Sequence, residues 1–204
     1  MDLPSKHLND IVTQFASLPS IGKRSALRLV LELLKRSPQE IEQFSDALLA
    51  MKEHIKHCKN CGNISDTEIC TICSNPLRDQ RTICVVEDIR DVMAIEATGT
   101  FKGIYHVLGG IISPMEGRGP NDLNIPSLIE KVDNNSVDEI IFALSATMEG
   151  DTTNFYIYKK IKDKNLTVTT LSRGVAIGTE LQYADELTLG RSILQRLPFE
   201  STFK

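Results

Sequence analysis

Apolar residues in the first part of the chain recur at the spacing of a helix face, which predicts three helices between residues 8 and 56. Residues 18–22, which include a proline and a glycine, interrupt the pattern after the first helix. Ser37-Pro38 then ends the second helix and starts the third. These signals predict a helical arm over residues 1–56. Its three apolar stripes are Leu8, Ile11, Val12 and Phe15; Ala26, Leu27, Val30, Leu31 and Leu34; and Ile41, Phe44, Leu48 and Ile55.

Beyond residue 80 the pattern changes to short, continuous apolar runs that are separated by helical stretches. The runs have the length and the Val/Ile content of buried strands. Strands that alternate with helices predict a parallel sheet with right-handed crossovers, so the expected fold class is α/β. The expected strands are 82–86, 103–108, 138–144 and 166–170; the expected helices are 88–97, 126–132 and 152–162; and residues 109–123 are expected to be a long loop.

Two Cys-x-x-Cys pairs, Cys58 with Cys61 and Cys70 with Cys73, lie between these two parts and are separated by eight residues. Four thiolates can fill the tetrahedral shell of Zn²⁺, and each short pair can direct two sulfurs to one metal. Two disulfides, or four unrelated buried thiols, are the alternatives. Both fit less well, because nothing else in the chain indicates an oxidising compartment and buried cysteines rarely occur as matched pairs. The spacing predicts a structural zinc knuckle over residues 57–76, whereas Cys84 is expected in the core.

The charge of the chain is distributed unevenly. Its 204 residues are 41% hydrophobic and 25% charged, which is typical of a globular protein, and the net charge is −4. Residues 1–36 hold six Lys and Arg against three Asp and Glu, a net of +3, whereas residues 82–204 hold twelve against seventeen, a net of −5. We therefore expect nucleic acid to meet the N-terminal arm. The sequence has no apolar signal region and no run of membrane-span length, so we expect a cytoplasmic protein that does not enter a membrane.

The junction between the first two predicted helices has the features of a helix-hairpin-helix DNA-binding element. Gly22 allows close approach of the backbone, and the amides that begin the next helix can bind a phosphate. Lys23 and Arg24 are poorly placed for the helix dipole, a conflict that a bound phosphate removes. Arg28, one turn on, is a further candidate. A plain helical bundle without a DNA site is the alternative, and Ser20 stands where such a hairpin usually has glycine.

Three carboxylates follow two of the predicted strands. Glu87 ends the first strand, and Glu149 and Asp151 follow the third. Functional residues of parallel sheets usually lie at the carboxyl ends of the strands. Three carboxylates at that edge can hold Mg²⁺ through a few oxygens and water. The arrangement resembles a Toprim domain, the module of type IA and type II topoisomerases and DnaG primases. Carboxylates that only cap loops or a helix, with Asp151 as an N-cap, are an equally open interpretation.

Taken in order, motifs across nearly the whole chain resemble those of the RecR family of bacterial recombination mediators. The glycine-rich 103–110 stretch is the most specific of them. Ser20 in the hairpin and Ala176, where the family often has proline, depart from the family pattern. The matching stretches are residues 18–26, the four cysteines, Val86-Glu87, residues 103–110, Ser113-Pro114, Gly119-Pro120, residues 149–151, Arg173-Gly174, residues 178–181 and residues 185–189.

The resemblance implies a non-enzymatic DNA-binding protein of gap repair. Proteins of this family act with RecO and RecF at gaps and single-strand/double-strand junctions, where they help to load RecA onto single-stranded DNA. The resemblance also implies that the Toprim surface, with Glu87, Glu149 and Asp151, docks RecO rather than performing catalysis. It further implies a homotetramer, a dimer of dimers that can close as a ring. The expected assembly surfaces are the first apolar stripe of the arm and a C-terminal stripe of Leu187, Leu189, Ile193 and Leu197.

Two other functions stay open at this point. A Mg²⁺-dependent Toprim enzyme that acts on phosphodiesters would need a nucleophile or nucleotide site, and no phosphate-gripping Gly-x-x-x-x-Gly-Lys loop is present in the sequence. A structural zinc adaptor that binds no DNA is disfavoured by the basic hairpin. The expected domains are 1–56 for DNA binding, 57–76 for zinc, 81–176 for the Toprim domain and 177–204 for assembly.

Overall fold

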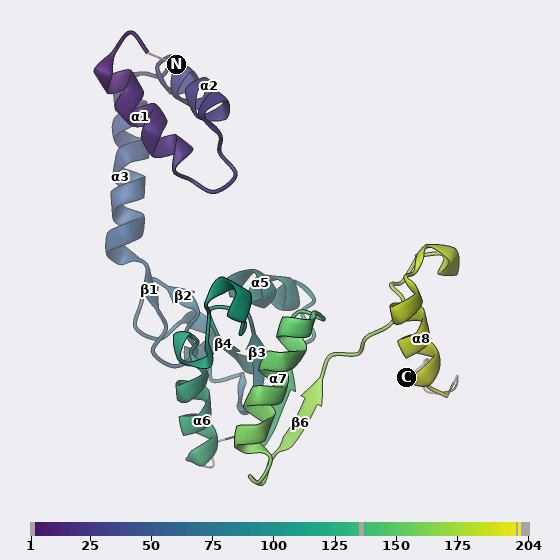
Figure 1. Cartoon of the computed structure of the whole chain (residues 1–204). Helices are drawn as coiled ribbons and strands as arrows, with labels where there is room; N and C mark the ends of the chain where they lie inside the picture. Colours follow the sequence, from purple (N-terminus) through teal and green to yellow (C-terminus); the bar gives the residue numbers. More distant parts are fainter. Residues whose placement is uncertain (1–2, 135–136, 199, 201–204) are drawn as a thin grey trace. The chain divides into compact units, whose positions relative to one another are not determined.

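The computed structural model describes residues 3–134, 137–198 and 200 (Figure 1). The chain divides into two compact units, Met1–Ile55 and Lys56–Lys204. The first unit is the helical arm, and the second joins the cysteine pairs to the α/β part. Within the part of the chain that is described, no helix is both long and apolar enough to cross a membrane.

The arm contains helices where the apolar stripes predict them. Ser5 caps the first helix by accepting a hydrogen bond from the Leu8 amide, and Ser37 and Glu40 form a capping box at the third. The helices are α1 (Lys6–Ala16), α2 (Lys23–Leu33) and α3 (Pro38–His54).

Packing inside the arm uses mainly α1 and α2. Val12, Ala26 and Val30 are buried against each other, with Leu8 and Phe15 partly buried beside them. Most of the first apolar stripe is therefore used inside the arm, whereas the sequence suggests an assembly surface there. None of the residues of α3, a helix that the structure describes throughout, is buried.

The sheet of the second unit is parallel, as predicted, and its strand order is β4-β3-β5-β6. The central strand β3 (Asp79–Val86) pairs with β4 (Gly103–Val107) on one side and with β5 (Glu139–Phe142) on the other. Strand β6 (Thr167–Thr170) pairs with β5. The carboxyl ends of all four strands therefore lie at one edge of the sheet.

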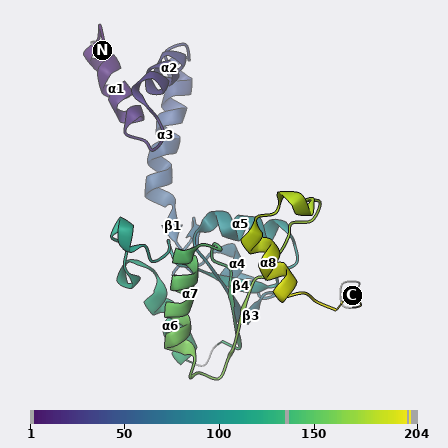
Figure 2. The same cartoon turned by 45° about the vertical axis from the view of Figure 1, so that its right-hand side comes forward.

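Alternating side chains of the strands build a core on each face of this sheet. Ile83 and Val85 face one way and pack with α6 (Ile125–Asp133) and α7 (Met148–Ile161), which lie side by side (Figures 1 and 2). Cys84 and Val86 face the other way and pack with α5 (Ile89–Ala97). The expectation that Cys84 is a core residue is confirmed, since it is 2% exposed.

The cysteine pairs form a small substructure within the second unit. Strands β1 (Lys56–His57) and β2 (Ile64–Ser65) pair in antiparallel fashion, and the one-turn helix α4 (Thr71–Ser74) carries Cys73. Val107 of β4 donates a backbone hydrogen bond of 2.7 Å to the Cys61 carbonyl. The knuckle is therefore joined to the edge strand of the parallel sheet.

Two segments differ from the sequence prediction, which assigned no helix or strand to the C-terminal segment. The 109–123 loop contains two short 3-10 helices, η1 (Pro114–Glu116) and η2 (Pro120–Asp122). Helix α7 begins at Met148, four residues earlier than predicted, and Thr147 caps it by accepting from the Gly150 amide at 3.1 Å. Asp151 therefore lies inside the helix, and its interpretation as the N-cap is wrong. The C-terminal segment contains η3 (Leu181–Tyr183) and α8 (Glu186–Leu194).

Candidate zinc centre and nucleic-acid interface

The four predicted zinc ligands lie together. Cys58, Cys61, Cys70 and Cys73 are buried, and their sulfurs all lie within 4.8 Å of one another. The Sγ atoms of Cys61 and Cys70 are 3.6 Å apart. A tetrahedral site with Zn–S bonds of about 2.3 Å requires sulfurs about 3.8 Å apart, so this cluster fits a Zn²⁺ ion. The closed, all-thiolate donor set is that of a structural site.

Backbone amides within the knuckle point at the sulfurs. The Cys70 amide donates to Cys58 Sγ at 3.2 Å, and the Cys73 amide donates to Cys70 Sγ at 3.5 Å. Burial raises the pKa of Cys58, but the backbone donors outweigh it and bring that pKa to about 7. A hydrogen bond with Cys73 and burial raise the pKa of Cys61. Zinc binding must therefore displace protons, chiefly from the more buried thiols.

Gly62 closes the first cysteine pair against the sheet. Its φ is +76°, and a Cβ at this position would come within 2.9 Å of Val107 O and of Asn124 Nδ2. A side chain is thus excluded by both the left-handed backbone and the contact with β4. This requirement explains why glycine follows Cys61.

The hairpin between α1 and α2 makes its turn at Ser20, the residue that departs from the usual glycine. Ser20 has φ +64°, a left-handed conformation that usually needs glycine. The hairpin therefore has the backbone turn of a glycine at this position, although it carries a serine. Ile21 donates a backbone hydrogen bond of 3.1 Å to Leu18 O, which closes the turn.

The start of α2 is basic and exposed. Gly22 is its N-cap, and among the described residues no side chain caps this end. A Cβ at Gly22 would meet no described atom within 4 Å, so the backbone is open on this side. Lys23, Arg24 and Arg28 are all placed at or near this end, and Lys23 and Arg24 are exposed. Uncapped amides with basic side chains beside them can bind a phosphate group.

The three predicted carboxylates lie at the carboxyl edge of the sheet but in different settings. Glu87 follows β3 and accepts a hydrogen bond of 3.3 Å from Ser145 Oγ. Glu149 is exposed in the first turn of α7. Asp151, two residues further along α7, is paired with Arg173, whose guanidinium holds the pKa of the Asp151 carboxyl below its usual range. Among the residues that the structure describes, three or more possible metal ligands come together only at the four cysteines, and not at these carboxylates.

Two contacts at these candidate sites join segments that are far apart in the sequence. Arg173 lies 22 residues from Asp151, and Lys131 of α6 donates to the carbonyl of Asn60 in the knuckle. Neither pair follows a helix or strand period. The stretch Arg173-Gly174 does stand among the motifs that resemble the RecR family, which was the one available indication for Arg173.

Family-level sequence profiles match almost all of the chain in consecutive segments. A RecR helix-hairpin-helix profile matches residues 8–52, and a RecR profile for a zinc finger domain with four cysteines matches residues 55–75. A Toprim domain profile matches residues 81–172, and a RecR C-terminal profile matches residues 174–196. The predicted zinc finger, helix-hairpin-helix and Toprim-like parts are thereby confirmed.

Relatives named Recombination protein RecR are similar along their full length. The protein of Flavobacterium johnsoniae is 62% identical over 204 residues, covering 100% of this chain and 99% of the relative. That of Porphyromonas gingivalis is 53% identical over 201 residues, covering 98% and 97%. That of Bacteroides thetaiotaomicron is 53% identical over 199 residues, also covering 98% and 97%. This chain belongs to the RecR family of recombination proteins.

Proposed function

We propose that this protein is a non-enzymatic recombination mediator of the cytoplasm that binds DNA at gaps and single-strand/double-strand junctions. In this role it acts with RecO and RecF and helps to load RecA onto single-stranded DNA. The observation that carries the proposal is the open, uncapped and basic start of α2 behind the left-handed turn at Ser20.

A DNA phosphate satisfies three features of this helix start at once. It accepts from the free amides at the N-terminus, it interacts favourably with the helix dipole, and it balances Lys23 and Arg24. Such contacts hold the backbone of DNA and do not read its sequence. Gap and junction binding requires this kind of contact, because gaps form at any sequence.

The carboxyl edge of the sheet is, in our proposal, a docking surface for RecO. The pairing of Asp151 with Arg173 supports docking over catalysis, because a guanidinium already balances one of the three carboxylates. Glu87 and Glu149 complete the surface. A Mg²⁺-dependent reaction on phosphodiesters is the alternative, and it would require Arg173 to leave Asp151 before the metal could bind there.

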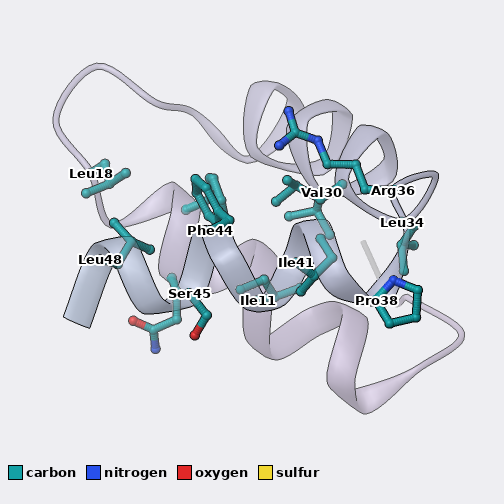
Figure 3. Close-up of a pocket in the computed structure, with 13 residues that line it drawn as sticks. Ile11, Leu18, Val30, Leu34, Arg36, Pro38, Ile41, Phe44, Ser45 and Leu48 are labelled. Atoms are coloured by element: carbon teal, nitrogen blue, oxygen red, sulfur yellow. The ribbon is translucent and has the colours of Figure 1, made fainter. Parts of the chain in front are cut away.

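The protein is also proposed to assemble as a homotetramer, a dimer of dimers. Side chains of α1, α2 and α3 line an apolar groove of about 810 Å³, and Figure 3 shows them pointing into a common space. Phe44 and Leu48 of α3 are 38% and 50% exposed there. In the C-terminal segment Leu187 and Ile193 of α8 are 66% and 59% exposed. Two apolar surfaces of this kind allow a closed, symmetric ring.

Assembly would compensate for weak individual DNA contacts. One hairpin holds only a few phosphates, and a contact of that size is weak at physiological salt. Several hairpins in one ring raise the effective concentration without any new contact. In the proposed division of labour, residues 1–56 bind DNA, 57–76 hold zinc, 81–176 dock RecO and 177–204 assemble the ring.

The DNA site is tested by a salt titration of binding to a gapped duplex. The variant Lys23→Glu/Arg24→Glu should bind DNA of every sequence more weakly. Its slope of log K against log salt should become shallower by about two, because about one unit of slope is lost with each phosphate contact. The matched control is Lys159→Glu/Lys160→Glu, which makes the same charge change on exposed lysines of α7. An unchanged slope in the first variant, or an equal loss in the control, would place the DNA site elsewhere.

The docking surface is tested separately from the DNA site. Glu149→Ala should reduce the association with RecO, measured by pull-down or calorimetry. It should leave unchanged both the salt dependence of DNA binding and the melting temperature. Incubation with Mg²⁺ and DNA should give no cleavage, relaxation or priming. Cleavage that is lost in Glu87→Ala would establish the enzymatic alternative.

The ring is tested by light scattering at micromolar concentration. Leu48→Glu in the groove, or Leu187→Glu in α8, should convert tetramers to dimers that keep zinc and lose most DNA affinity. Leu77→Glu is the matched control, because Leu77 is 88% exposed and lies outside both surfaces. Wild-type protein that is monomeric yet binds gapped DNA with full affinity would contradict the ring.

A further inference from the structure

A lysine of the α/β part reaches into the zinc knuckle. Lys131 lies in α6 and is partly buried, and its ammonium donates to the main-chain carbonyl of Asn60. Asn60 stands between the ligands Cys58 and Cys61 in the chain. The same Nζ atom lies 3.4 Å from Nδ1 of His106. One side chain thus contacts the knuckle and the sheet together.

His106 forms the other end of this connection. It is a residue of β4, it is 0% exposed, and its Nε2 lies 2.7 Å from the Asn124 carbonyl oxygen. A carbonyl can only accept, so Nε2 carries the proton and Nδ1 is left to accept from Lys131. Burial and the charge of Lys131 hold the pKa of His106 down at about 4. The imidazole is therefore a neutral link between the lysine and the loop before α6.

The position of Lys131 suits the charge of an occupied knuckle. Four thiolates around Zn²⁺ carry a net charge of −2, and the four sulfurs are buried. Burial lowers the pKa of Lys131, while the thiolates of Cys61, Cys73 and Cys58 raise it. Lys59, which lies between the ligands Cys58 and Cys61 in the chain, is two-thirds exposed and pairs with Glu68 at 2.9 Å. Lys131 is thus the better shielded of the two cations.

We propose that Lys131 is a positioning residue of the zinc centre, which offsets the charge of the metal–thiolate group and links zinc occupancy to the packing of α6 on β4. The residues beyond the ligands of a metal site orient those ligands and adjust its charge, and their loss typically lowers metal affinity by about 10- to 100-fold. In this chain the link runs from the Asn60 carbonyl through Lys131 to His106.

The test measures zinc affinity by competition with a chromogenic chelator. Lys131→Met removes the charge and keeps the aliphatic length, and its zinc affinity should fall about 10- to 100-fold. Lys131→Arg keeps the charge and should stay within about threefold of wild type. Lys162→Met removes the same charge from an exposed lysine that follows α7 and should have no effect. Lys131→Gln keeps a donor for the Asn60 carbonyl without the charge, and it replaces Lys131→Met if that variant does not fold.

Two further readouts separate this role from ordinary packing. Co²⁺ substituted into Lys131→Met should show the same tetrahedral thiolate absorption bands as wild type, reached at higher Co²⁺ concentration. The rise in melting temperature on adding zinc to stripped protein should be smaller in the variant. Wild-type zinc affinity in the folded Met or Gln variant would overturn the proposal. So would a melting temperature that falls equally with and without zinc.

Discussion

The helical arm and the Toprim-like domain use apolar residues in opposite ways. In the domain, Ile83, Val85 and Ile140 are at most 1% exposed, and they belong to a continuous core under α6 and α7. In the arm, burial is concentrated on Val12, Ala26 and Val30, and α3 leaves Phe44 and other apolar side chains exposed. The domain therefore has a continuous core of its own, whereas the arm leaves the apolar side chains of α3 without a core to pack in. Contact functions suit the arm because they use side chains that its own fold does not need.

This contrast has a direct experimental meaning. Substitutions that disturb the interior of the domain should cost stability first, and substitutions in the arm should change binding first. The expected effects on stability range from the loss of zinc, which is the largest, to a single turn residue in the arm, which is the smallest.

Removal of zinc should destabilise the domain and spare the arm. Structural zinc sites in small domains bind with about 10 kcal/mol or more of free energy, so Cys61→Ser or a strong chelator should lower the melting temperature by about 10 °C or more. Hydrogen exchange should show lost protection in β4, which bonds to Cys61, and unchanged protection in α1 and α2. The control is Cys84→Ala, which alters a buried cysteine outside the cluster and should keep one zinc per chain. Loss of protection in α1 and α2 on zinc removal would contradict the expectation that zinc stabilises the domain and not the arm.

Gly150→Ala should strongly destabilise the domain. A Cβ at Gly150 would lie 2.0 Å from the Ser145 carbonyl oxygen, so α7 or the segment that joins β5 to α7 must move. Overpacking of this kind costs about 3 kcal/mol, which corresponds to a fall of about 6–12 °C in melting temperature for a domain of this size. In the arm, Gly22→Ala meets open space and should cost less than about 1 kcal/mol. Thermal unfolding of both variants, followed by circular dichroism, measures the two losses. An equal fall in melting temperature in both variants would contradict the expected difference between the domain and the arm.

An ion pair inside the domain should make its stability depend on acid pH. Arg78 and Glu96 pair with side chains only 15% and 29% exposed, and Tyr105 donates to Glu96 at 2.7 Å. Arg78 lowers the pKa of Glu96 below its ordinary value of 4.5. The stabilisation is therefore fully present above about pH 4.5 and is lost as the pH falls through the lowered pKa.

Glu96→Gln should reveal this dependence by removing it. The variant should cost about 2 kcal/mol at pH 7, because Arg78 is left without its counter-ion, and the cost should shrink at pH 3. Urea unfolding at the two pH values measures the difference. Glu40→Gln in the arm is the control, since the exposed Glu40 pairs with Ser37 in a capping box that glutamine can also form. A loss at pH 3 as large as at pH 7 would exclude the ion pair as the cause.

The sequence is informative wherever the physical cause is local. Helical spacing, the Ser37-Pro38 helix start, the Val/Ile-rich strands and the paired cysteines act over a few residues, so each can be recognised without a structure. The start of α7 was missed because Gly150 and its neighbours favour a loop by propensity. In the fold, the Thr147 cap and the close fit of Gly150 against Ser145 override that preference.

Long-range pairings could not be predicted from the residues alone. Arg173 neutralises Asp151 and Lys131 reaches Asn60 because the sheet order and the knuckle bring distant segments together. No periodicity of the sequence encodes such an approach. The exposed apolar face of α3 is a related case, because its stripe is the same whether the helix packs internally or binds another molecule.

The smallest effect on stability is expected from a substitution of Ser20. The test is whether that substitution stabilises or destabilises the arm. A side chain in the left-handed conformation costs about 1–2 kcal/mol, and glycine avoids that cost at about 0.5–1 kcal/mol of additional chain entropy. With φ at +64°, Ser20→Gly should therefore stabilise the arm by about 0.5–1 kcal/mol. Ser25→Gly makes the same exchange within α2 and should destabilise the arm by about 0.5 kcal/mol or slightly more. Hydrogen exchange of α1 and α2 amides reports on the arm alone, and gapped-DNA binding should keep its salt slope in both variants. If both variants lose protection, the hairpin does not hold Ser20 in the left-handed turn, and the open start of α2 that it prepares loses its structural basis.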